Sequence, residues 1–376
     1  MIFAAQPRLP DCESPIWSTE VLAELGRGRG VFIRFPDPGR AGVVFSNDRH
    51  LIVYEVDHDV GQPPARTTAE ILRPFLLRLL LLDSDSGKVA LRREERTRVQ
   101  DVAVFATAAG LLVKTGALIK LFSADLAQDR DVPFAIDRDS RIRISVSATG
   151  KTIMLNDVIQ DSLNRFHSYF NVLDVATGKV RYSWNESPPL YHHYSISDEG
   201  IAAVNLVGDF IAVAGFGTSK WTRVGEPAGL CSSVNMPTLY SDRQFVYGCD
   251  KLIAMSIDGH VLMTDSFPIG DTPSDKTTVA QDGRFVAVSL DTIEVKKHFL
   301  AESSQRVTAT HVVVYDLALK KRALTVNVDP LPKNDYDFAL SPDGSKLAVL
   351  NDRKVSVYSV PVQSTDHAEA VRREIP

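Results

Sequence analysis

The sequence predicts an all-β fold, a seven-bladed β-propeller with four-stranded antiparallel blades. Two turn motifs recur along the chain, and helical periodicity is nearly absent. FALSPDGSKLAVLNDRKVSVYSV, from Phe338 to Val360, displays the unit, with Ser-Pro-Asp-Gly between strands of alternating apolar and polar residues. Pro342 fixes φ, the Asp343 side chain can bond the following backbone, and Gly344 tolerates positive φ. The tetrapeptide therefore reads as a hairpin turn, and its aspartate has a structural explanation.

The same turn recurs six more times. Four copies keep a glycine, at Gly110, Gly150, Gly200 and Gly283. Two others replace it with Asp-Arg, around positions 48 and 242. The turns lie about 40 to 60 residues apart, which is a period typical of propellers and solenoids. Because the units contain strands rather than helices, a propeller is favoured.

A second motif follows the first turn in four of the units. An apolar strand ends in Asp or Ser, a short polar turn comes next, and another strand begins. The four copies are LLLLDSDSGKVALRR, FNVLDVATGKVRYSW, AMSIDGHVLMT and VVVYDLALKKRALTV. This is the hairpin expected between the third and fourth strands of a blade, so each unit supplies four strands.

The last unit stops after its third strand, at about Val360. A fourth strand is needed there to cover an open sheet edge. The segment SPIWSTEVL, residues 14–22, has no other assignment, so we expect it to complete the seventh blade and close the ring. We therefore predict one domain over residues 1–362, with residues 363–376 as a short, charged, flexible tail.

Three of the intervals between successive turns are longer than the base period of about 40 residues, and they show where residues are inserted. The excess lies at about residues 57–74, 157–168 and 291–310, between the second and third strands of three blades. Such loops emerge on one face of a propeller, together with fourth-to-first linkers such as NESPPLYHHYS at residues 185–195. Loops on a rigid scaffold often carry binding function, so we predict a binding face there. The alternative is that surface loops simply tolerate extra length.

The candidate binding residues are polar and aromatic side chains in those loops. They are Asp57, His58, Asp59, Arg165, His167, Tyr191, His192, His193, Lys296, Lys297 and His298. Adjacent histidines alone make no metal site without a third ligand, so no metal and no other cofactor is predicted. No Gly-x-Ser-x-Gly elbow and no His-Glu-x-x-His motif occurs, and no catalytic residue is assigned.

Composition narrows the classes of partner. The formal charge is −5 and no Lys- or Arg-rich block occurs, so a nucleic-acid partner is not expected. The longest apolar run, FLLRLLLL, is too short to span a bilayer and contains Arg78, so no transmembrane segment is predicted. The first residues lack the basic and apolar regions of a signal peptide. We expect a monomer whose partner is an unidentified protein or peptide.

Cysteine use leaves the compartment open. The chain has Cys12, Cys231 and Cys249 and no Cys-x-x-Cys pair. Buried reduced thiols indicate a cytoplasmic protein. A bridge between Cys231 and Cys249 is the alternative, since both positions fall near one end of the fifth blade's first hairpin. That bridge would indicate a periplasmic or secreted protein with a leader outside this sequence.

The units resemble those of bacterial WD-repeat-like, or YVTN-type, β-propellers, which share the pattern SPDG, LAV, VYD and TGK. The resemblance covers about residues 34–360. The Gly-His and Trp-Asp signatures of eukaryotic WD repeats are absent, so their hydrogen-bond tetrad is not expected. LDVATGKVRYSW is also similar to quinoprotein repeats, but those carry a tryptophan in every blade and this chain has three in all.

Two functions remain open from the sequence. The first is a non-catalytic propeller that binds a protein or peptide through the long loops on one face. The second is a metal-dependent small-molecule hydrolase or lactonase with its site in the central channel, as in lactonase-like propellers. The sequence favours the first function without deciding whether the protein is an enzyme.

Overall fold

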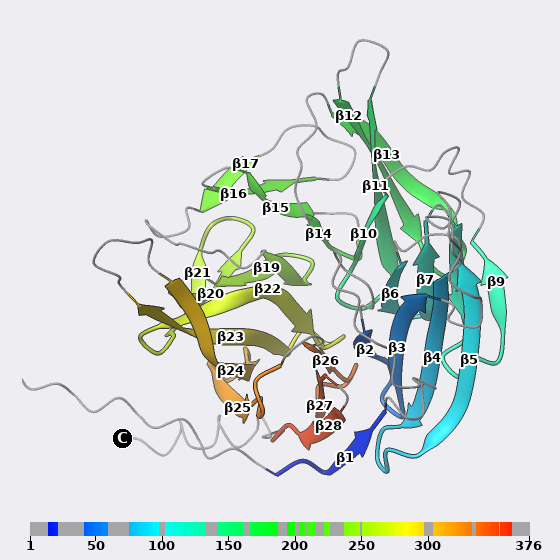
Figure 1. The fold of residues 1–376 in the computed structure, drawn as a ribbon. Helices are drawn as coiled ribbons and strands as arrows, with labels where there is room; N and C mark the ends of the chain where they lie inside the picture. Colours follow the sequence, from blue (N-terminus) through cyan, green and yellow to red (C-terminus); the bar gives the residue numbers. More distant parts are fainter. Residues whose placement is uncertain are drawn as a thin grey trace, which may run out of the picture.

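The computed structural model describes most of the chain as β-strands in antiparallel sheets. The described residues are 14–21, 41–58, 75–97, 102–116, 118–132, 142–160, 166–186, 194–199, 203–207, 210–215, 222–225, 237–248, 250–296, 304–332, 336–352 and 354–362. Within these ranges there are seven four-stranded sheets and no helix. In Figure 1 the sheets follow one another in chain order around a common centre.

Six of the sheets are formed by four consecutive strands each. The first two comprise β2 (Ala41–Asn47), β3 (His50–His58), β4 (Phe75–Asp83) and β5 (Val89–Thr97), then β6 (Val102–Thr107), β7 (Gly110–Thr115), β8 (Leu118–Phe122) and β9 (Asp129–Asp131). The next two comprise β10 (Arg143–Val146), β11 (Thr152–Gln160), β12 (Phe166–Asp174) and β13 (Val180–Glu186), then β14 (Tyr194–Ile196), β15 (Ala203–Val207), β16 (Phe210–Ala214) and β17 (Thr222–Gly225). The last two comprise β18 (Thr238–Ser241), β19 (Gln244–Gly248), β20 (Lys251–Ser256) and β21 (Val261–Ser266), then β22 (Asp271–Val279), β23 (Phe285–Lys296), β24 (Ser304–Asp316) and β25 (Lys321–Asn327).

The seventh sheet combines both ends of the chain. It contains β26 (Tyr336–Leu340), β27 (Lys346–Asn351), β28 (Lys354–Ser359) and, as its fourth strand, β1 (Trp17–Glu20). Trp17 lies opposite Val357, and the Ile16 N–H donates to the Val357 carbonyl at 2.7 Å. The paired segment is shorter than the stretch expected from the sequence, residues 14–22.

The core consists of seven hydrophobic clusters, each shared by two sheets. Along β3, Leu51 and Val53 pack toward β27 and β28, whereas Ile52 and Val56 pack toward the sheet of β6 to β9. The remaining clusters join each sheet to the next in chain order. Because successive side chains of a strand point to opposite faces, continuous apolar strands are buried on both sides. The fold is an all-β propeller with four-stranded antiparallel blades.

The recurring glycine turn also contacts the neighbouring sheet. Gly150 has a φ of +73°, and a Cβ there would lie 2.6 Å from the backbone of Thr107 and Ala108. Gly283 has a φ of +72°, and its Cβ would lie 2.1 Å from the Tyr240 carbonyl oxygen. Glycine is therefore required by backbone conformation and by packing between sheets.

Hydrogen bonds link these turns from sheet to sheet. The donors and acceptors are Ala108 N to Gly150 O (3.0 Å), Thr149 Oγ1 to Asp198 Oδ2 (2.6 Å), Asp198 N to Asp242 Oδ1 (3.0 Å), Gln281 N to Pro342 O (2.8 Å) and Asp343 N to Asp48 Oδ1 (2.8 Å). The aspartates of the turn motif therefore accept hydrogen bonds that hold adjacent sheets together.

The second recurring turn is stabilised by its aspartate. Asp83 Oδ1 accepts hydrogen bonds from the Ser86 hydroxyl (2.6 Å) and the Ser86 N–H (2.8 Å). Asp174 Oδ1 accepts the equivalent pair from Thr177, both at 2.8 Å. These hydrogen bonds lower the pKa of both carboxyl groups. The aspartate repeated in D-x-x-S/T-G-K is thus a turn-stabilising residue.

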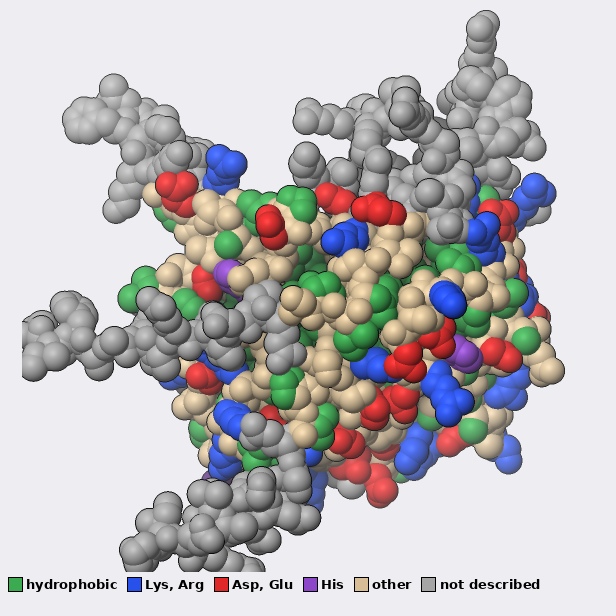
Figure 2. All heavy atoms as spheres, turned by 90° about the horizontal axis from the view of Figure 1, so that it is seen from below, with side chains coloured by type: hydrophobic (Ala, Val, Ile, Leu, Met, Phe, Trp, Pro, Cys, Tyr) green, Lys and Arg blue, Asp and Glu red, His purple; other side chains and the backbone are tan. Residues whose placement is uncertain are grey.

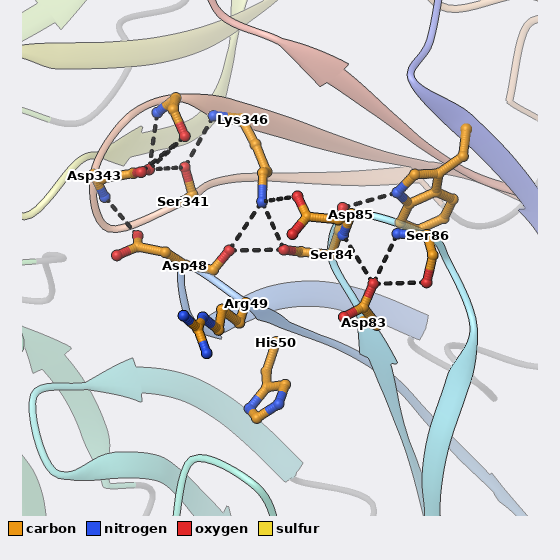
Figure 3. Close-up of polar contacts among 12 residues, drawn as sticks. Asp48, Arg49, His50, Asp83, Ser84, Asp85, Ser86, Ser341, Asp343 and Lys346 are labelled. Atoms are coloured by element: carbon orange, nitrogen blue, oxygen red, sulfur yellow. Dashed lines mark hydrogen bonds and ion pairs between the residues drawn. The ribbon is translucent and has the colours of Figure 1, made fainter.

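Figure 3 shows the junction between the first and last sheets. The Lys346 ammonium donates to the Asp48 carbonyl at 3.1 Å and to the Ser84 hydroxyl at 2.8 Å, and it lies 2.7 Å from the Asp85 carboxylate. The indole Nε1 of Trp17 donates to the Ser84 carbonyl at 2.8 Å. Lys346 and Trp17, from different strands of the seventh sheet, therefore hold the same turn of the first sheet.

Two of the three expected loop insertions are largely strand, so those predictions were wrong. Residues 157–168 were expected to form a loop, but Asp157 pairs with Tyr169 and Gln160 with Phe166. Residues 291–310 were also expected as a loop, but pairing of β23 with β24 runs from Asp291 to Lys296. In both segments the second and third strands continue to pair past the end of the first strand, so the inserted residues lengthen a hairpin instead of forming a loop. The first insertion was expected at about residues 57–74, but Asp57 and His58 pair with Leu76 and Phe75 as the end of β3. Residues 59–74, the turn at Gly200 and the tail 363–376 lie outside the described residues.

Candidate functional site

A cavity of about 260 Å³ lies where the first strands of all seven sheets meet. Its wall includes residues of β2, β6, β10, β14, β18, β22 and β26, together with Tyr54 of β3. The lining includes Phe45, Phe105 and Phe338 together with Ser, Thr, Gln, Lys and Asp side chains. Polar and apolar atoms contribute nearly equal parts of the exposed wall, so the central channel offers hydrogen-bonding groups beside apolar surface.

One ion pair lies in the channel wall. The Lys276 ammonium of β22 bonds the Asp337 carboxylate of β26, and the other oxygen of that carboxylate accepts the Val43 N–H of β2 at 2.8 Å. The ammonium also lies 5.3 Å from the ring centre of Phe338. Asp337 is 12% exposed and Lys276 41%, so the carboxylate is the better shielded partner. This pair connects three sheets across the channel wall.

Tyr54 reaches the channel because Gly42 lies opposite it. The two residues are paired across β2 and β3, and a Cβ on Gly42 would lie 2.3 Å from both the ring and the hydroxyl of Tyr54. Elsewhere in the wall, the Ser195 hydroxyl of β14 accepts the Leu239 N–H at 2.7 Å. The channel wall therefore contains hydroxyl groups as well as its ion pair.

The donor set of the channel suits hydrogen bonding to a ligand. Asp337 is the single carboxylate in the described part of the wall, and it already bonds an ammonium and a backbone N–H. Among the residues that the structure describes, no group of three His, Cys, Asp or Glu side chains is placed to hold a metal ion. In the same residues there is no helix long and apolar enough to cross a membrane.

Four of the predicted binding residues lie in described strands. Asp57 and His58 end β3, His167 is in β12 opposite Ile159, and Lys296 ends β23. These positions belong to three different sheets, each at the end of a second strand or the start of a third. His167 was expected in a loop and is instead a half-buried strand residue.

The remaining candidates lie outside the described residues. They are Asp59, Arg165, Tyr191, His192, His193, Lys297 and His298, together with the possible disulfide partners Cys231 and Cys249.

The sixth sheet carries a projecting two-stranded ribbon, which we define as residues 293–296 of β23 and 304–307 of β24. β22 begins opposite Thr292, and β25 ends opposite His311. Beyond these points only β23 and β24 continue to pair within the described chain. Figure 1 shows the long β23 and β24 arrows on the left of the molecule.

The ribbon is amphipathic. Ile293 lies directly opposite Val307, and Val295 lies two residues further along on the same face. Val295 is 50% exposed and Val307 is 40% exposed. The opposite face carries the cross-strand neighbours Glu294 and Arg306, both exposed. An aliphatic face is therefore presented to solvent.

A further exposed aliphatic residue adjoins the ribbon. Ile269 is 95% exposed, in the linker between β21 and β22. The carbonyl of the next residue, Gly270, accepts the Ile293 N–H at 3.0 Å, which places this linker against the base of the ribbon. We call Ile269, Ile293, Val295 and Val307 the sixth-sheet apolar patch. Exposed apolar residues that gather in this way are typical of interaction sites, unlike single ones.

Sequence reasoning missed both the channel residues and the apolar patch. The channel residues could have been found by assigning every first strand to the channel wall, which includes Lys276 and Asp337. Aliphatic and charged residues alternate at Ile293, Glu294 and Val295, and this alternation is typical of a strand. It could have indicated the ribbon inside the segment 291–310, for which the turn spacing predicts a loop.

Among the side chains that the structure describes, the face shown in Figure 2 has no large area in which side chains of a single charge predominate. Acidic and basic side chains are interspersed there, with apolar side chains between them. A docking surface on this face would therefore depend on shape and apolar contact as well as on charge.

Comparison with known proteins supports the fold. No family model and no curated protein matches the chain. A chain in the crystal structure of the mitotic checkpoint complex is similar to it, with a TM-score of 0.51 and 11% identity, covering 96% of this chain and 99% of that chain. The C-terminal WD40 domain of Sif2 has a TM-score of 0.45 and 11% identity, with 86% and 97% covered. At this identity the likeness concerns the fold alone. The predicted all-β propeller with four-stranded antiparallel blades is confirmed.

Proposed function

We propose that the seven sheets are the seven blades of one closed ring, formed by a single domain within residues 1–362. Three observations support this proposal. A hydrophobic cluster joins every sheet to the next, including the last to the first. The central channel is lined by all seven first strands, and β1 provides the fourth strand of the last sheet.

We propose that this ring is a non-catalytic scaffold that binds a protein or peptide. The observation that carries the proposal is the sixth-sheet apolar patch. Its residues Ile269, Val295 and Val307 are exposed although each could have been polar without loss of core packing. Exposing aliphatic area to water is unfavourable, at roughly 25 cal/mol per Å², and covering it with a partner recovers that free energy.

The predicted loop residues fit the same proposal. Asp57, His58 and Lys296 end second strands, so the segments that follow them connect second to third strands. Connections of this class leave a propeller blade on one face, and fourth-to-first linkers such as the one with Ile269 share that face. We therefore propose that the predicted loop residues surround the apolar patch and contribute polar contacts to the rim of one interface.

Photo-crosslinking in the native host tests the scaffold function. A benzoylphenylalanine replaces Val295 in one variant and Val261 in a matched control. Val261 is 57% exposed on the outer strand β21 of the neighbouring sheet, so the two sites differ in position and not in exposure. We expect a discrete adduct from position 295 and none from position 261.

A second step shows whether the adduct reflects affinity. The partner protein found in the adduct is purified on its own. Its affinity is then measured for the wild-type chain, for Val295→Asp and for Val261→Asp. We expect Val295→Asp to weaken binding by at least tenfold, since a charge would be buried in an apolar contact. Identical adducts from both positions, or equal affinities for both variants, would overturn the proposal.

A further inference from the structure

The outer edge of β24 is uncovered where the ribbon leaves the sheet. β25 pairs with β24 up to His311 and Asn327, and the Val328 N–H then donates to the Thr310 carbonyl at 2.9 Å. β24 itself begins six residues earlier in the chain, at Ser304. Within the described residues, no strand lies along this edge between Ser304 and Ala309.

Backbone hydrogen bonding determines which groups face this edge. The Ile293 N–H donates to Gly270, on the β22 side, so Ile293 and Val307 form a pair without hydrogen bonds between them. In an antiparallel pair of this kind, both residues direct N–H and C=O away from each other. Val307 therefore directs its backbone groups to the uncovered edge. Gln305, two residues away and opposite Val295, does the same.

We propose that this edge accepts an extended segment of a partner protein, which adds to β24 as a further strand. The inference rests on the proposed scaffold function and specifies how the partner binds. An unpaired edge supplies donors and acceptors at the spacing of another strand, so backbone hydrogen bonds hold the segment in place. The sequence SQRVTAT of this edge contains no Lys and no Pro, and its β-bulge lies between Val307 and Ala309, so an added strand would pair with residues 304–307 before the bulge.

The two faces of the ribbon specify the chemistry of the segment. Side chains of an added strand alternate between the face of Val295 and Val307 and the face of Arg306. Aliphatic residues complement the first face. Acidic residues complement the guanidinium of Arg306, which is exposed and lies on β24 next to the added strand, whereas its cross-strand neighbour Glu294 lies one strand further away. The partner segment therefore alternates aliphatic and acidic residues over about five positions.

Panning of a random nine-residue peptide library on phage tests the inference directly. The purified full-length chain is the target, and selected peptides are then measured against three variants. Gln305→Pro removes one N–H from the outer edge without removing a bond to β23. Gln305→Ala keeps that N–H and serves as the matched control. Val307→Asp reverses the character of the aliphatic face.

We expect enriched peptides to alternate aliphatic and acidic residues. Their affinity should be equal for the wild type and Gln305→Ala, and at least tenfold weaker for Gln305→Pro and Val307→Asp. N-methylation of the peptide provides a readout that does not depend on how a variant folds. Methyl groups on one alternate set of amides should abolish binding, whereas methyl groups on the other set should have little effect.

The outcomes separate this inference from the scaffold function. Equal affinity of the peptides for Gln305→Pro and the wild type, or enrichment without alternation, overturns strand addition. If Val295→Asp still weakens binding of the photo-crosslinked partner by at least tenfold, the scaffold function stands with another binding mode. A concentration-dependent dimer that is lost in Gln305→Pro would identify a second copy of this chain as the occupant and would overturn the proposal of a separate partner.

Discussion

The Asp343 N–H donates a 2.8 Å hydrogen bond to the carboxylate of Asp48, and this bond joins the turn of the last sheet to the turn of the first (Figure 3). The two carboxyl groups differ in their environment. Partial loss of hydration, together with the negative charge of Asp343, raises the pKa of Asp48. Burial also acts to raise the pKa of Asp343, but hydrogen bonds from Ser341 and Ser345 outweigh it and lower that pKa.

Replacing Asp48 with Asn should stabilise the protein at neutral pH. A carboxyl whose folded pKa is raised contributes stability below its unfolded pKa and loses that contribution as pH rises through the folded pKa. Asn keeps an oxygen for the Asp343 N–H and carries no charge. The melting temperature of Asp48→Asn should therefore exceed that of the wild type at pH 7, with a difference that shrinks toward pH 4. A difference in melting temperature that stays constant from pH 4 to pH 7 would contradict a raised pKa of Asp48 as its cause.

Replacing Asp343 with Asn should have the opposite pH dependence. A carboxyl with a lowered folded pKa contributes stability above its unfolded pKa, and this contribution disappears as pH falls through the folded pKa. Asp343→Asn should lower the melting temperature at pH 7 and have less effect in acid below pH 4. Thermal unfolding of both variants over one pH series provides the check, because the two differences must change in opposite directions.

Trp17→Ala should weaken attachment of the N-terminal strand. The indole donates to Ser84 and packs on Gly87, where a Cβ would lie 2.6 Å from the ring. We expect a loss of about 2 kcal/mol in the free energy of unfolding. Ile16→Ala is the control, since Ile16 is 49% exposed and bonds β28 through its backbone.

Removal of residues 1–24 should have a larger effect than Trp17→Ala. It would expose the edge of β28, so we expect aggregation or loss of cooperative unfolding. A monomeric truncated protein with an unchanged melting temperature would show that β1 does not stabilise the last sheet.

Gly283→Ala should be more destabilising than Gly270→Ala. Both glycines have positive φ, at +72° and +95°, so both variants carry backbone strain. A methyl group on Gly283 would also meet the Tyr240 carbonyl, whereas nothing lies within 4 Å of the Cβ position of Gly270. We expect about 1 kcal/mol for Gly270→Ala and at least about 2 kcal/mol for Gly283→Ala. Equal losses in chemical denaturation would argue against the close packing of adjacent sheets.

A double-mutant cycle should detect coupling between Lys276 and Asp337. Asp337→Asn keeps an acceptor for the Val43 N–H, and Lys276→Met keeps the length of the side chain. Because Lys276 is 41% exposed, solvent screens the pair, and we expect a coupling energy of about 1 kcal/mol. The coupling should fall at high salt. A value near zero at low salt would show that the hydrogen bond to Val43 is what holds Asp337.

The repeated turns allowed the architecture to be predicted, because each turn depends on local chemistry. The glycines and aspartates at 110, 150, 283 and 343 have fixed roles in a hairpin, and alternation shows which strands follow. Their second role, in contacts between sheets, was not visible in the sequence. It depends on atoms such as the Tyr240 carbonyl, which lies 43 residues from Gly283 in the chain (283 − 240).

The candidate site was predicted less well. The lengths of β23 and β24 could not be inferred from turn spacing, because an inserted segment can form a loop or extend a hairpin. Ile293 and Val307 pair only when the hairpin extends, so their common face appears only in the structure. Lys276 and Asp337 lie 61 residues apart, and nothing in their local sequence indicates that they meet.

The pairing of β1 with β28 has a consequence for synthesis of the chain. Ser18 and Ser356, which bond through their hydroxyls, are separated by 338 positions. At roughly 5 to 20 residues per second, the first strand waits about 20 to 70 s after leaving the ribosome before its partner is made. During that interval six sheets can form and Trp17 can already contact Ser84 and Gly87 of the first sheet, while β1 still lacks the strand β28 with which its backbone pairs. A chaperone that shields the nascent N-terminal segment would therefore act before the last sheet assembles, and slowing translation near the end of the message would lengthen its task.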